Sequence, residues 1–434
     1  MRFPLLALAA ALTLVVTLAP EAPGGEHPVP DEGTLRAMTA RFAPVDLGAD
    51  ISGLPDSERE ALAKTIEAAR IMGPLYLRQI WAGNEALLGE LLVHRQSGLG
   101  EARLHAFLVN NGPWTRLDHD VPFLAGVPER PAAANFYPAR ATKEEVEGWF
   151  ASLPEEERTE AQGYFTTIRR GPDGALVAVP YSVEYQGELA RAAELLREAA
   201  AATRQPTLRA YLETRAEAFL SNDYFESDMA WMELEATIEP TIGPYEVYDD
   251  GWFGYKAAFE AFVGVRDEDE TRKLDRFSKE LQWLEDRLPI RPEWRNPKIG
   301  ALAPLRVIDL VYASGQGNSD VQTAAFNLPN DPRVVAQKGS KRVMLKNTQE
   351  AKFQMALVPI SKVALAPEDR ERLSFDAFFT HILMHELVHG IGPKTITVDG
   401  RETTVREQLK ELRSPLEEAK ADIVGLWAMQ QLVD

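Results

Sequence analysis

The segment whose residue types and spacing are best suited to chemistry is His385-Glu386-Leu387-Val388-His389. Two histidines four positions apart on a helix project from one face, so both imidazoles can reach one metal ion. The glutamate after the first histidine can then accept a proton from a water molecule that the metal activates. This HExxH pattern is typical of zinc hydrolases, most often peptidases, although it also occurs by chance on ordinary helices. It predicts His385 and His389 as ligands of one Zn²⁺ ion and Glu386 as the general base.

A helix must carry these side chains, and the local sequence predicts one. Ser374 is a candidate N-cap, and Gly390, directly after the second histidine, is a candidate stop. Between them, apolar residues recur at helical spacing: Phe375, Phe378, Ile382 and Leu383. His381 lies one turn before His385 on the same face. It could join the metal site, but a partly buried structural histidine is the simpler interpretation.

A catalytic zinc site uses three protein ligands and a water molecule, so a third ligand is needed. The extended motif HExxHxxGxxH would supply a third histidine. Gly392 fits that motif, but its last position is Thr395, which excludes this class. A carboxylate ligand is the remaining option.

Such a carboxylate is available on a second helix, which is predicted to start, or to restart after a kink, at Pro415. Ser414 is a candidate N-cap, and Glu417 three residues later would complete a capping box. Glu418 and Asp422 lie one turn apart on one face of this helix, so Glu418 is the expected third ligand. Acidic residues also favour a helix N-terminus through the macrodipole, and Glu417 could have only that role.

Glu417-Glu418-Ala419-Lys420-Ala421-Asp422 resembles the second motif, EE-x-[KR]-A-[ED], of the dipeptidyl peptidase III family of zinc exopeptidases. The family's first motif is usually HExxGH. The five-residue form found here keeps the ordinary zinc spacing. The resemblance covers about residues 223–434. It implies that Asp422, with Glu417, supports the ligand histidines by hydrogen bonds.

Further stretches extend the resemblance to a substrate cleft. The segment from Asn327 to Asn330 resembles the family's NxPN segment, whose asparagines bind the peptide backbone. Residues 242–249 and 259–262 resemble the segments that recognise the peptide N-terminus and the scissile carbonyl. The resemblance therefore implies dipeptide release, with these residues at the substrate: Glu246, Tyr248, Glu260, Asn327 and Asn330, of which Tyr248 would be catalytic. Taken alone, the asparagine pair and residues 248–251 are typical of turns.

The expected fold is α+β. Helices are predicted at 56–93, at 142–152, at 154–167, at 185–220 with a break near Pro206, and at 267–288; strands are predicted at 104–110, 175–181, 305–312 and 343–359. By resemblance, a largely helical zinc-binding lobe faces a lobe that contains a β-barrel, with the cleft between them. Residues 25–266 and 304–360 would form the mixed substrate lobe, and residues 267–303 and 361–434 the zinc lobe. In the family the chain continues beyond the second motif, where a histidine and an arginine contribute to the active site, so the zinc lobe is expected to be incomplete at its C-terminus.

Composition narrows the class of protein. The chain has 434 residues and a formal net charge of −19, which disfavours nucleic acid as a partner. For the peptide substrate that the zinc motif and the resemblance imply, this charge favours cationic or neutral peptides. It has no cysteine, which excludes disulfides, thiol catalysis and thiolate metal sites.

The N-terminus is typical of an export signal. Met1 and Arg2 precede an apolar segment at residues 3–19, and Pro20 to Gly25 interrupts it. Residues 1–24 are therefore predicted to be a signal peptide, which implies a periplasmic or secreted enzyme. Pro20 directly after a small-residue cleavage site tends to block cleavage. An inner-membrane anchor formed by residues 3–19 is the alternative.

Two other functions stay open. A catalytically degenerate zinc- or peptide-binding protein of the same fold would keep the motifs without turnover. A Nudix-type hydrolase is a minor alternative, suggested by the Arg- and Glu-rich sequence around Arg406 and Glu407. The glycine and glutamate that a Nudix box requires upstream at fixed spacing are missing.

Overall fold

The computed structural model describes residues 29–299, 304–319 and 322–433. Its largest sheet has five strands in the order β5 (Ile238–Glu246), β6 (Ala258–Arg266), β7 (Leu305–Gly315), β9 (Lys341–Leu345) and β8 (Ala325–Leu328). β7 and β9 run parallel, and the other neighbours are antiparallel. The predicted signal peptide or anchor, residues 1–24, lies outside the described residues. None of the described helices is long and apolar enough to cross a membrane.

Two strands of this sheet, β5 and β6, are strongly buried, and the sheet is not a closed barrel within the described residues. In β5 and β6 every residue except the last is buried, so both faces of these strands are covered. The edge strands β5 and β8 are not paired with each other. They nevertheless come close, because the Asn330 side-chain amide donates a hydrogen bond of 2.9 Å to the Tyr245 carbonyl oxygen. The expected α+β fold is thus confirmed, whereas the closed barrel is not found.

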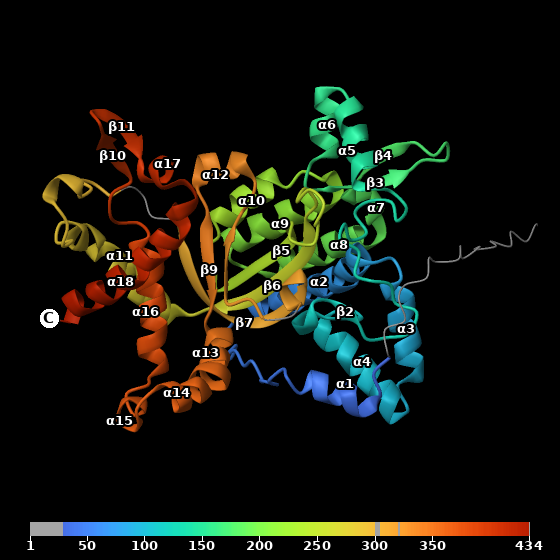
Figure 1. Ribbon diagram of the computed structural model, residues 1–434, viewed down its shortest axis with the longest axis horizontal. Coiled ribbons are helices and arrows are strands. Elements are labelled where there is room, and N and C mark those ends of the chain that lie inside the picture. Colours follow the sequence, from blue (N-terminus) through green and yellow to red (C-terminus); the bar gives the residue numbers. More distant parts are fainter. Residues whose placement is uncertain (1–28, 300–303, 320–321, 434) are drawn as a thin grey trace, which may run out of the picture.

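Helices from the first half of the chain cover this sheet. α2 packs against β6 and β7, and α8 packs between α2 and α9 (Figure 1). Together they enclose the larger hydrophobic core. The elements of this half are α1 (Glu32–Thr39), α2 (Asp56–Ile80), α3 (Asn84–His94), α4 (Gly98–Asn110), β1 (Trp114–Thr115), β2 (Val121–Pro122), α5 (Lys143–Ser152), α6 (Glu155–Ala161), β3 (Thr166–Arg170), β4 (Leu176–Pro180), α7 (Tyr181–Glu184), α8 (Gln186–Ala202), α9 (Pro206–Ser221) and α10 (Phe225–Met232).

A second, smaller core lies at the left of Figure 1, where α11 (Glu268–Glu285), α16 (Phe375–Val388) and α18 (Arg413–Val433) meet. Val307 of β7 and Met344 of β9 join it, so the sheet contributes one face to each core. Around these helices lie α12 (Pro332–Lys338), α13 (Lys346–Lys352), α14 (Val358–Ala364), α15 (Pro367–Arg370), β10 (Thr395–Val398), β11 (Arg401–Thr404) and α17 (Val405–Leu409).

Several predicted elements agree with the structure. The break between α8 and α9 falls just before Pro206, and Asp267 caps α11 by accepting a hydrogen bond of 2.9 Å from the Glu270 amide. Three predictions were wrong. Residues 104–110 belong to α4, whose N-cap is Ser97, and residues 162–167 leave α6 and enter β3. Most of residues 343–359 are helical, because the chain leaves β9 directly into α13 and a π-helical turn, Phe353–Leu357.

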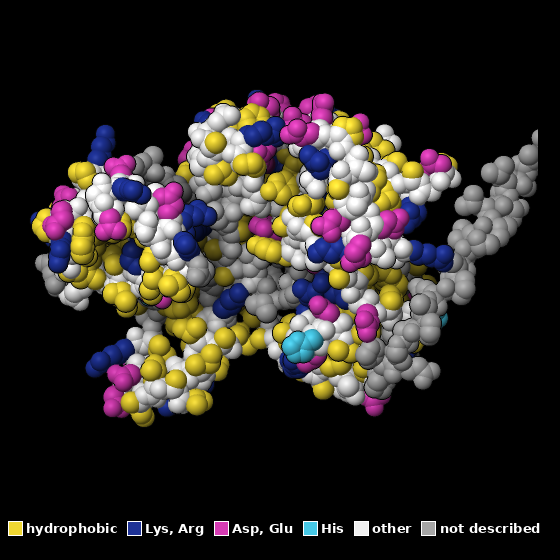
Figure 2. Space-filling view, turned by 45° about the horizontal axis from the view of Figure 1, so that its top comes forward, with side chains coloured by type: hydrophobic (Ala, Val, Ile, Leu, Met, Phe, Trp, Pro, Cys, Tyr) yellow, Lys and Arg dark blue, Asp and Glu magenta, His cyan; other side chains and the backbone are white. Residues whose placement is uncertain are grey.

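The surface carries mixed charge. In Figure 2, acidic and basic side chains are interspersed, and no continuous basic patch is seen on this face. Hydrophobic side chains are dense on the part at the left, which carries α14 and α18 in Figure 1. Val363 and Ile423 on these helices are 91% and 68% exposed.

Candidate functional site

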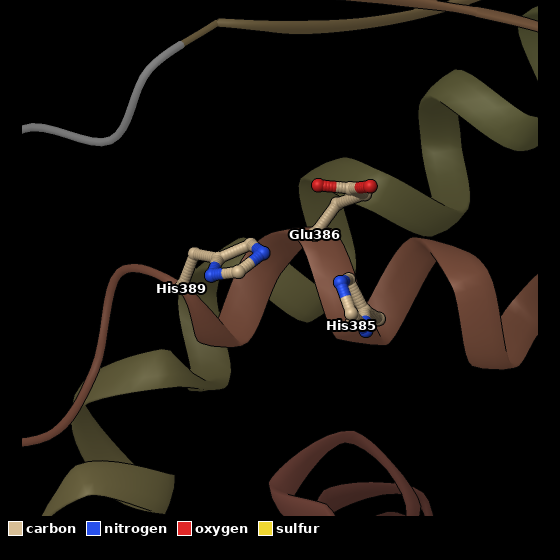
Figure 3. A group of neighbouring side chains, drawn as sticks. All are labelled: His385, Glu386 and His389. Atoms are coloured by element: carbon tan, nitrogen blue, oxygen red, sulfur yellow. The ribbon is translucent and has the colours of Figure 1, made fainter. Parts of the chain in front are cut away.

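α16 carries the HExxH residues at its C-terminal end. Ser374 caps the helix as predicted, accepting a hydrogen bond from the Ala377 amide, and the last helical residue is Val388, so His389 is the C-cap. Figure 3 shows both imidazoles and the Glu386 carboxylate projecting from this one helix. One potential ligand atom from each of His385, Glu386 and His389 lies within 4.8 Å of the other two. The spacing thus brings a metal-binding group together.

α18 supplies the carboxylates that face these histidines. The helix begins at Arg413, so Ser414 and Pro415 lie inside its first turn, and the capping box expected at Ser414 is wrong. The capping box of this region lies earlier, where Thr404 and Glu407 begin α17. Gly425 lets α18 approach α16 closely, since a Cβ at this position would lie only 3.1 Å from the His385 backbone nitrogen.

Glu418 is the carboxylate nearest both imidazoles. Its Oε2 lies 3.1 Å from His385 Nε2 and 3.8 Å from His389 Nε2. Ligand atoms about 2.0–2.1 Å from a tetrahedral Zn²⁺ ion are roughly 3.3 Å apart, and the two observed distances lie on either side of that value. The structure therefore brings Glu418 within reach of an ion that both histidines could bind.

The other nitrogen of each imidazole, Nδ1, contacts a second carboxylate of α18. Asp422 Oδ1 lies 2.8 Å from His385 Nδ1, and Glu417 Oε1 lies 2.9 Å from His389 Nδ1. A carboxylate can only accept there, and in the tautomer that carries its proton on Nδ1 each ring turns an Nε2 lone pair toward Glu418. Lone pairs crowded against a carboxylate repel one another unless a cation lies between them. This donor set fits a zinc ion with orienting carboxylates behind the histidines.

Glu417 is the better buried of the two supporting carboxylates. Burial opposes its ionisation, but hydrogen bonds with His389 and Lys420 lower the pKa of Glu417 to about 2. Lys420 Nζ lies 2.7 Å from Glu417 Oε1 and also donates to the Ile391 carbonyl oxygen at 2.9 Å. Lys420 thus fastens the loop after α16 to α18.

The same loop is held from α11. Buried Glu285 accepts a hydrogen bond of 2.6 Å from the Gly392 amide through Oε2 and one of 2.7 Å from the Asn296 amide through Oε1. His381 Nε2 lies 3.3 Å from the Asp422 backbone carbonyl oxygen, and His381 is not in the metal-binding group of the described residues. Its position agrees with the structural interpretation of this histidine.

A second polar cluster lies where β5 and β6 are joined. Glu246 ends β5, and its carboxylate is hydrogen bonded with both Tyr248 and Asn330. Burial raises the pKa of Glu246 against these hydrogen bonds. Burial, followed by the charges of Glu246 and Asp249, raises the pKa of Glu260 well above its usual range. Four of the five predicted cleft residues therefore lie close together, although residue 330 is far from the others in sequence.

The loop that carries Tyr248 is organised by Asp250, a residue that the sequence interpretation missed. Its Oδ2 accepts hydrogen bonds of 2.8 Å from the Tyr137 hydroxyl and from the Tyr255 amide. Its Oδ1 accepts from the amides of Trp252 and Phe253 at 3.3 and 3.2 Å. The alternative prediction of a turn at residues 248–251 is correct for the backbone. It does not exclude a functional Tyr248, which is 79% exposed.

Asn327, the fifth cleft residue, lies on β8 opposite Arg342 of β9. Opposite residues of an antiparallel pair project from the same face of the sheet. The Arg342 guanidinium forms an ion pair with the Glu386 carboxylate on α16. Through its neighbour Arg342, Asn327 is therefore linked to α16, the helix that carries the HExxH residues. Arg342 was missed by the sequence interpretation, since no motif marks a contact between two distant elements.

Comparison with known proteins agrees with this arrangement. The model of peptidase family M49 matches residues 135–400, more than half of the chain. The structure of dipeptidyl-peptidase III from Corallococcus sp. strain EGB is 66% identical, with a TM-score of 0.77, over 94% of this chain and 75% of that one. The structure of DPP III from Caldithrix abyssi is 44% identical, with a TM-score of 0.84, over 92% of this chain and 75% of that one.

A curated relative, Nudix hydrolase 3 of Arabidopsis thaliana, is 39% identical over 449 residues, which cover 92% of this chain. The chain spans 58% of that protein's length. The solved structures have the two-lobed fold that the resemblance implied. On the match of the family model and the likeness to two dipeptidyl-peptidase III structures, this chain belongs to peptidase family M49.

Proposed function

We propose that this chain is a zinc-dependent metallopeptidase that releases dipeptides from the N-termini of peptides. The observation that carries the proposal is the meeting of two helices at one donor set. His385 and His389 of α16 turn their Nε2 atoms toward Glu418 of α18, and each ring is held from behind by a carboxylate. One Zn²⁺ ion is the cation that suits two imidazoles and a carboxylate.

The reaction assigns a separate role to each neighbouring side chain. A bound zinc ion would polarise water and the scissile carbonyl group. Glu386 lies beside the ligands, accepts the proton of the attacking water and returns it to the leaving amine. Tyr248 is largely exposed, and its hydroxyl can exchange its hydrogen bond with Glu246 for one to the carbonyl oxygen as negative charge develops there.

Dipeptide release follows from where the peptide's N-terminus is held. Glu246 and Glu260 repel each other in a buried setting, and a protonated α-amino group would relieve that repulsion. Asn327 and Asn330 would bind the peptide backbone beside β8. Two extended residues span about 7 Å, so an N-terminus fixed at the two glutamates would present the second peptide bond to a centre about that far away.

The division into lobes is also a proposal. Residues 267–303 and 361–434 would form the zinc lobe, and residues 25–266 and 304–360 the substrate lobe. The smaller core supports this division, because it joins α11, α16 and α18. Export to the periplasm or beyond, directed by residues 1–24, is proposed from the sequence alone.

Nudix chemistry is not supported by the geometry. Glu407, which suggested it, accepts a hydrogen bond of 3.1 Å from the Thr404 amide in the capping box of α17. A glutamate engaged in this way has a structural role. The degenerate alternative differs from our proposal only in turnover, which is measured directly.

The test is product analysis. The purified chain, loaded with zinc, is incubated with a hexapeptide, and the products are identified by mass spectrometry over time. We expect the N-terminal dipeptide and the complementary tetrapeptide first, and no cleavage when the peptide's N-terminus is acetylated. Release of single amino acids would reject dipeptidyl specificity. Intact peptide in the presence of stoichiometric bound zinc would favour the degenerate alternative.

A further inference from the structure

We propose that Arg342 is a positioning residue for the general base, holding one oxygen of the Glu386 carboxylate so that the other is aimed at the attacking water. This inference rests on the proposed function, in which Glu386 takes a proton. Nothing in the HExxH or EE-x-[KR]-A-[ED] motifs specifies Arg342. It comes from the substrate sheet and reaches across to the metal-binding helix.

The location of Arg342 separates it from ordinary structural ion pairs. Along β9, Lys341 and Val343 face the larger core side, where Lys341 pairs with buried Glu239 at 2.6 Å. Arg342 and Met344 face the other way, and Met344 packs in the smaller core with α16. Alternation along the strand therefore directs the guanidinium to the HExxH helix.

The contact is specific in its chemistry. Arg342 Nη1 forms an ion pair with Glu386 Oε2, and the two side chains are only 30% and 16% exposed. Burial lowers the pKa of Arg342, and the Glu418 carboxylate opposes this, which places the guanidinium near the third expected ligand as well. Among the described residues, Glu386 is the side chain that forms an ion pair with Arg342, and Glu418 acts on the guanidinium through its charge. The remaining N–H groups can then meet a peptide carbonyl.

A carboxylate that transfers a proton needs one free oxygen in a fixed direction. A glutamate side chain has three rotatable bonds, and ordering it costs conformational entropy. If the side chain is already held in one orientation, this cost is not added to the activation free energy of the proton transfer. In our proposal the guanidinium supplies that constraint by its ion pair with Oε2, a buried oxygen without a hydrogen-bond partner among the described residues, and leaves Oε1 available. Because Arg342 lies opposite Asn327, the residue that orients the base is carried by the same strand pair as a proposed peptide-binding residue.

The experiment compares Arg342→Gln and Arg342→Lys with the matched control Arg306→Gln. Arg306 lies on the neighbouring strand β7 and pairs with Glu235, away from Glu386. On a dipeptide substrate carrying a chromogenic leaving group, Arg342→Gln should lower kcat about 10- to 100-fold, which is the usual range for removing a supporting hydrogen-bond partner. KM and zinc content should change little, Arg342→Lys should recover part of the loss, and Arg306→Gln should leave kcat unchanged.

A second measurement is made on the metal-free protein and does not depend on activity. Arg342→Gln should shift the urea midpoint of unfolding in the wild-type background but not in a Glu386→Gln background, since the partner charge is already gone. An equal shift in both backgrounds would reject the pairing. Unchanged kcat, or raised KM alone, would overturn the positioning role while leaving the peptidase proposal intact. Failure of the wild type to cleave peptides would reject the peptidase proposal, and the unfolding cycle would still decide the pairing.

Discussion

Removing the carboxylates behind the ligand histidines should weaken zinc binding by amounts that follow their burial. Asp422 contacts His385 Nδ1 at 2.8 Å with a side chain 62% exposed, whereas Glu417 contacts His389 Nδ1 at 2.9 Å and is 22% exposed. Loss of such a partner costs about 10- to 100-fold in metal affinity, or about 1.4–2.8 kcal/mol. Water can replace an exposed partner more readily than a buried one. We therefore expect Asp422→Ala near the lower limit and Glu417→Ala near the upper limit.

The assay is competition for zinc against a chromophoric chelator at fixed pH and ionic strength. Asp376→Ala is a suitable control, because Asp376 lies in the first turn of α16 and pairs with Lys273, remote from the histidines. Equal zinc affinity in all three variants would refute the assignment of supporting roles. An effect of Asp422→Ala larger than that of Glu417→Ala would refute the argument from burial.

Three further predictions concern other parts of the molecule. Gly425→Ala should lower zinc affinity severalfold in the same competition assay, since its Cβ would lie 3.1 Å from the His385 backbone nitrogen and push α18 from α16; unchanged affinity would show that the helices can adjust. The KM for a peptide substrate should fall as pH rises, because burial raises the pKa values of Glu246 and Glu260 and so delays their ionisation to higher pH. It should rise again as the α-amino group loses its proton near pH 8. A KM independent of pH would contradict amine binding at these glutamates. Burial lowers the pKa of Lys256 to about 7 despite nearby Asp250, so between about pH 7 and about pH 10 the unfolded chain binds more protons than the folded chain. The free energy of unfolding should therefore rise with pH in this range, by at most about 1.4 kcal/mol per pH unit. Urea titrations of the metal-free protein should show this slope, and it should be absent from Lys256→Met.

The candidate metal-binding group could be predicted from sequence because its geometry is local to two helices. Residues i and i+4 share a helical face, so His385 with His389, and Glu418 with Asp422, are paired by spacing alone. Their meeting across α16 and α18 was not specified by either helix. It depends on Gly425 and on the smaller core, which only the folded chain brings together.

Other features could not be predicted from local patterns. The start of α18 was misplaced because Ser414 and Pro415 are a strong helix-start signal, yet the preceding residues continue into the helix. Asp250 acts through backbone amides and a tyrosine far away in sequence, and Arg342 acts across the two cores. Contacts of this kind have no spacing rule, so sequence periodicity does not reveal them.

The central claim is that zinc is bound by His385, His389 and Glu418 while Glu386 performs the proton transfer. The most direct test measures zinc stoichiometry and dipeptide release together for the wild type and Glu386→Gln. The account predicts one zinc ion per chain in both proteins and a loss of dipeptide release by several orders of magnitude in the variant. Loss of zinc from Glu386→Gln, or dipeptide release at the wild-type rate with zinc bound, would contradict it.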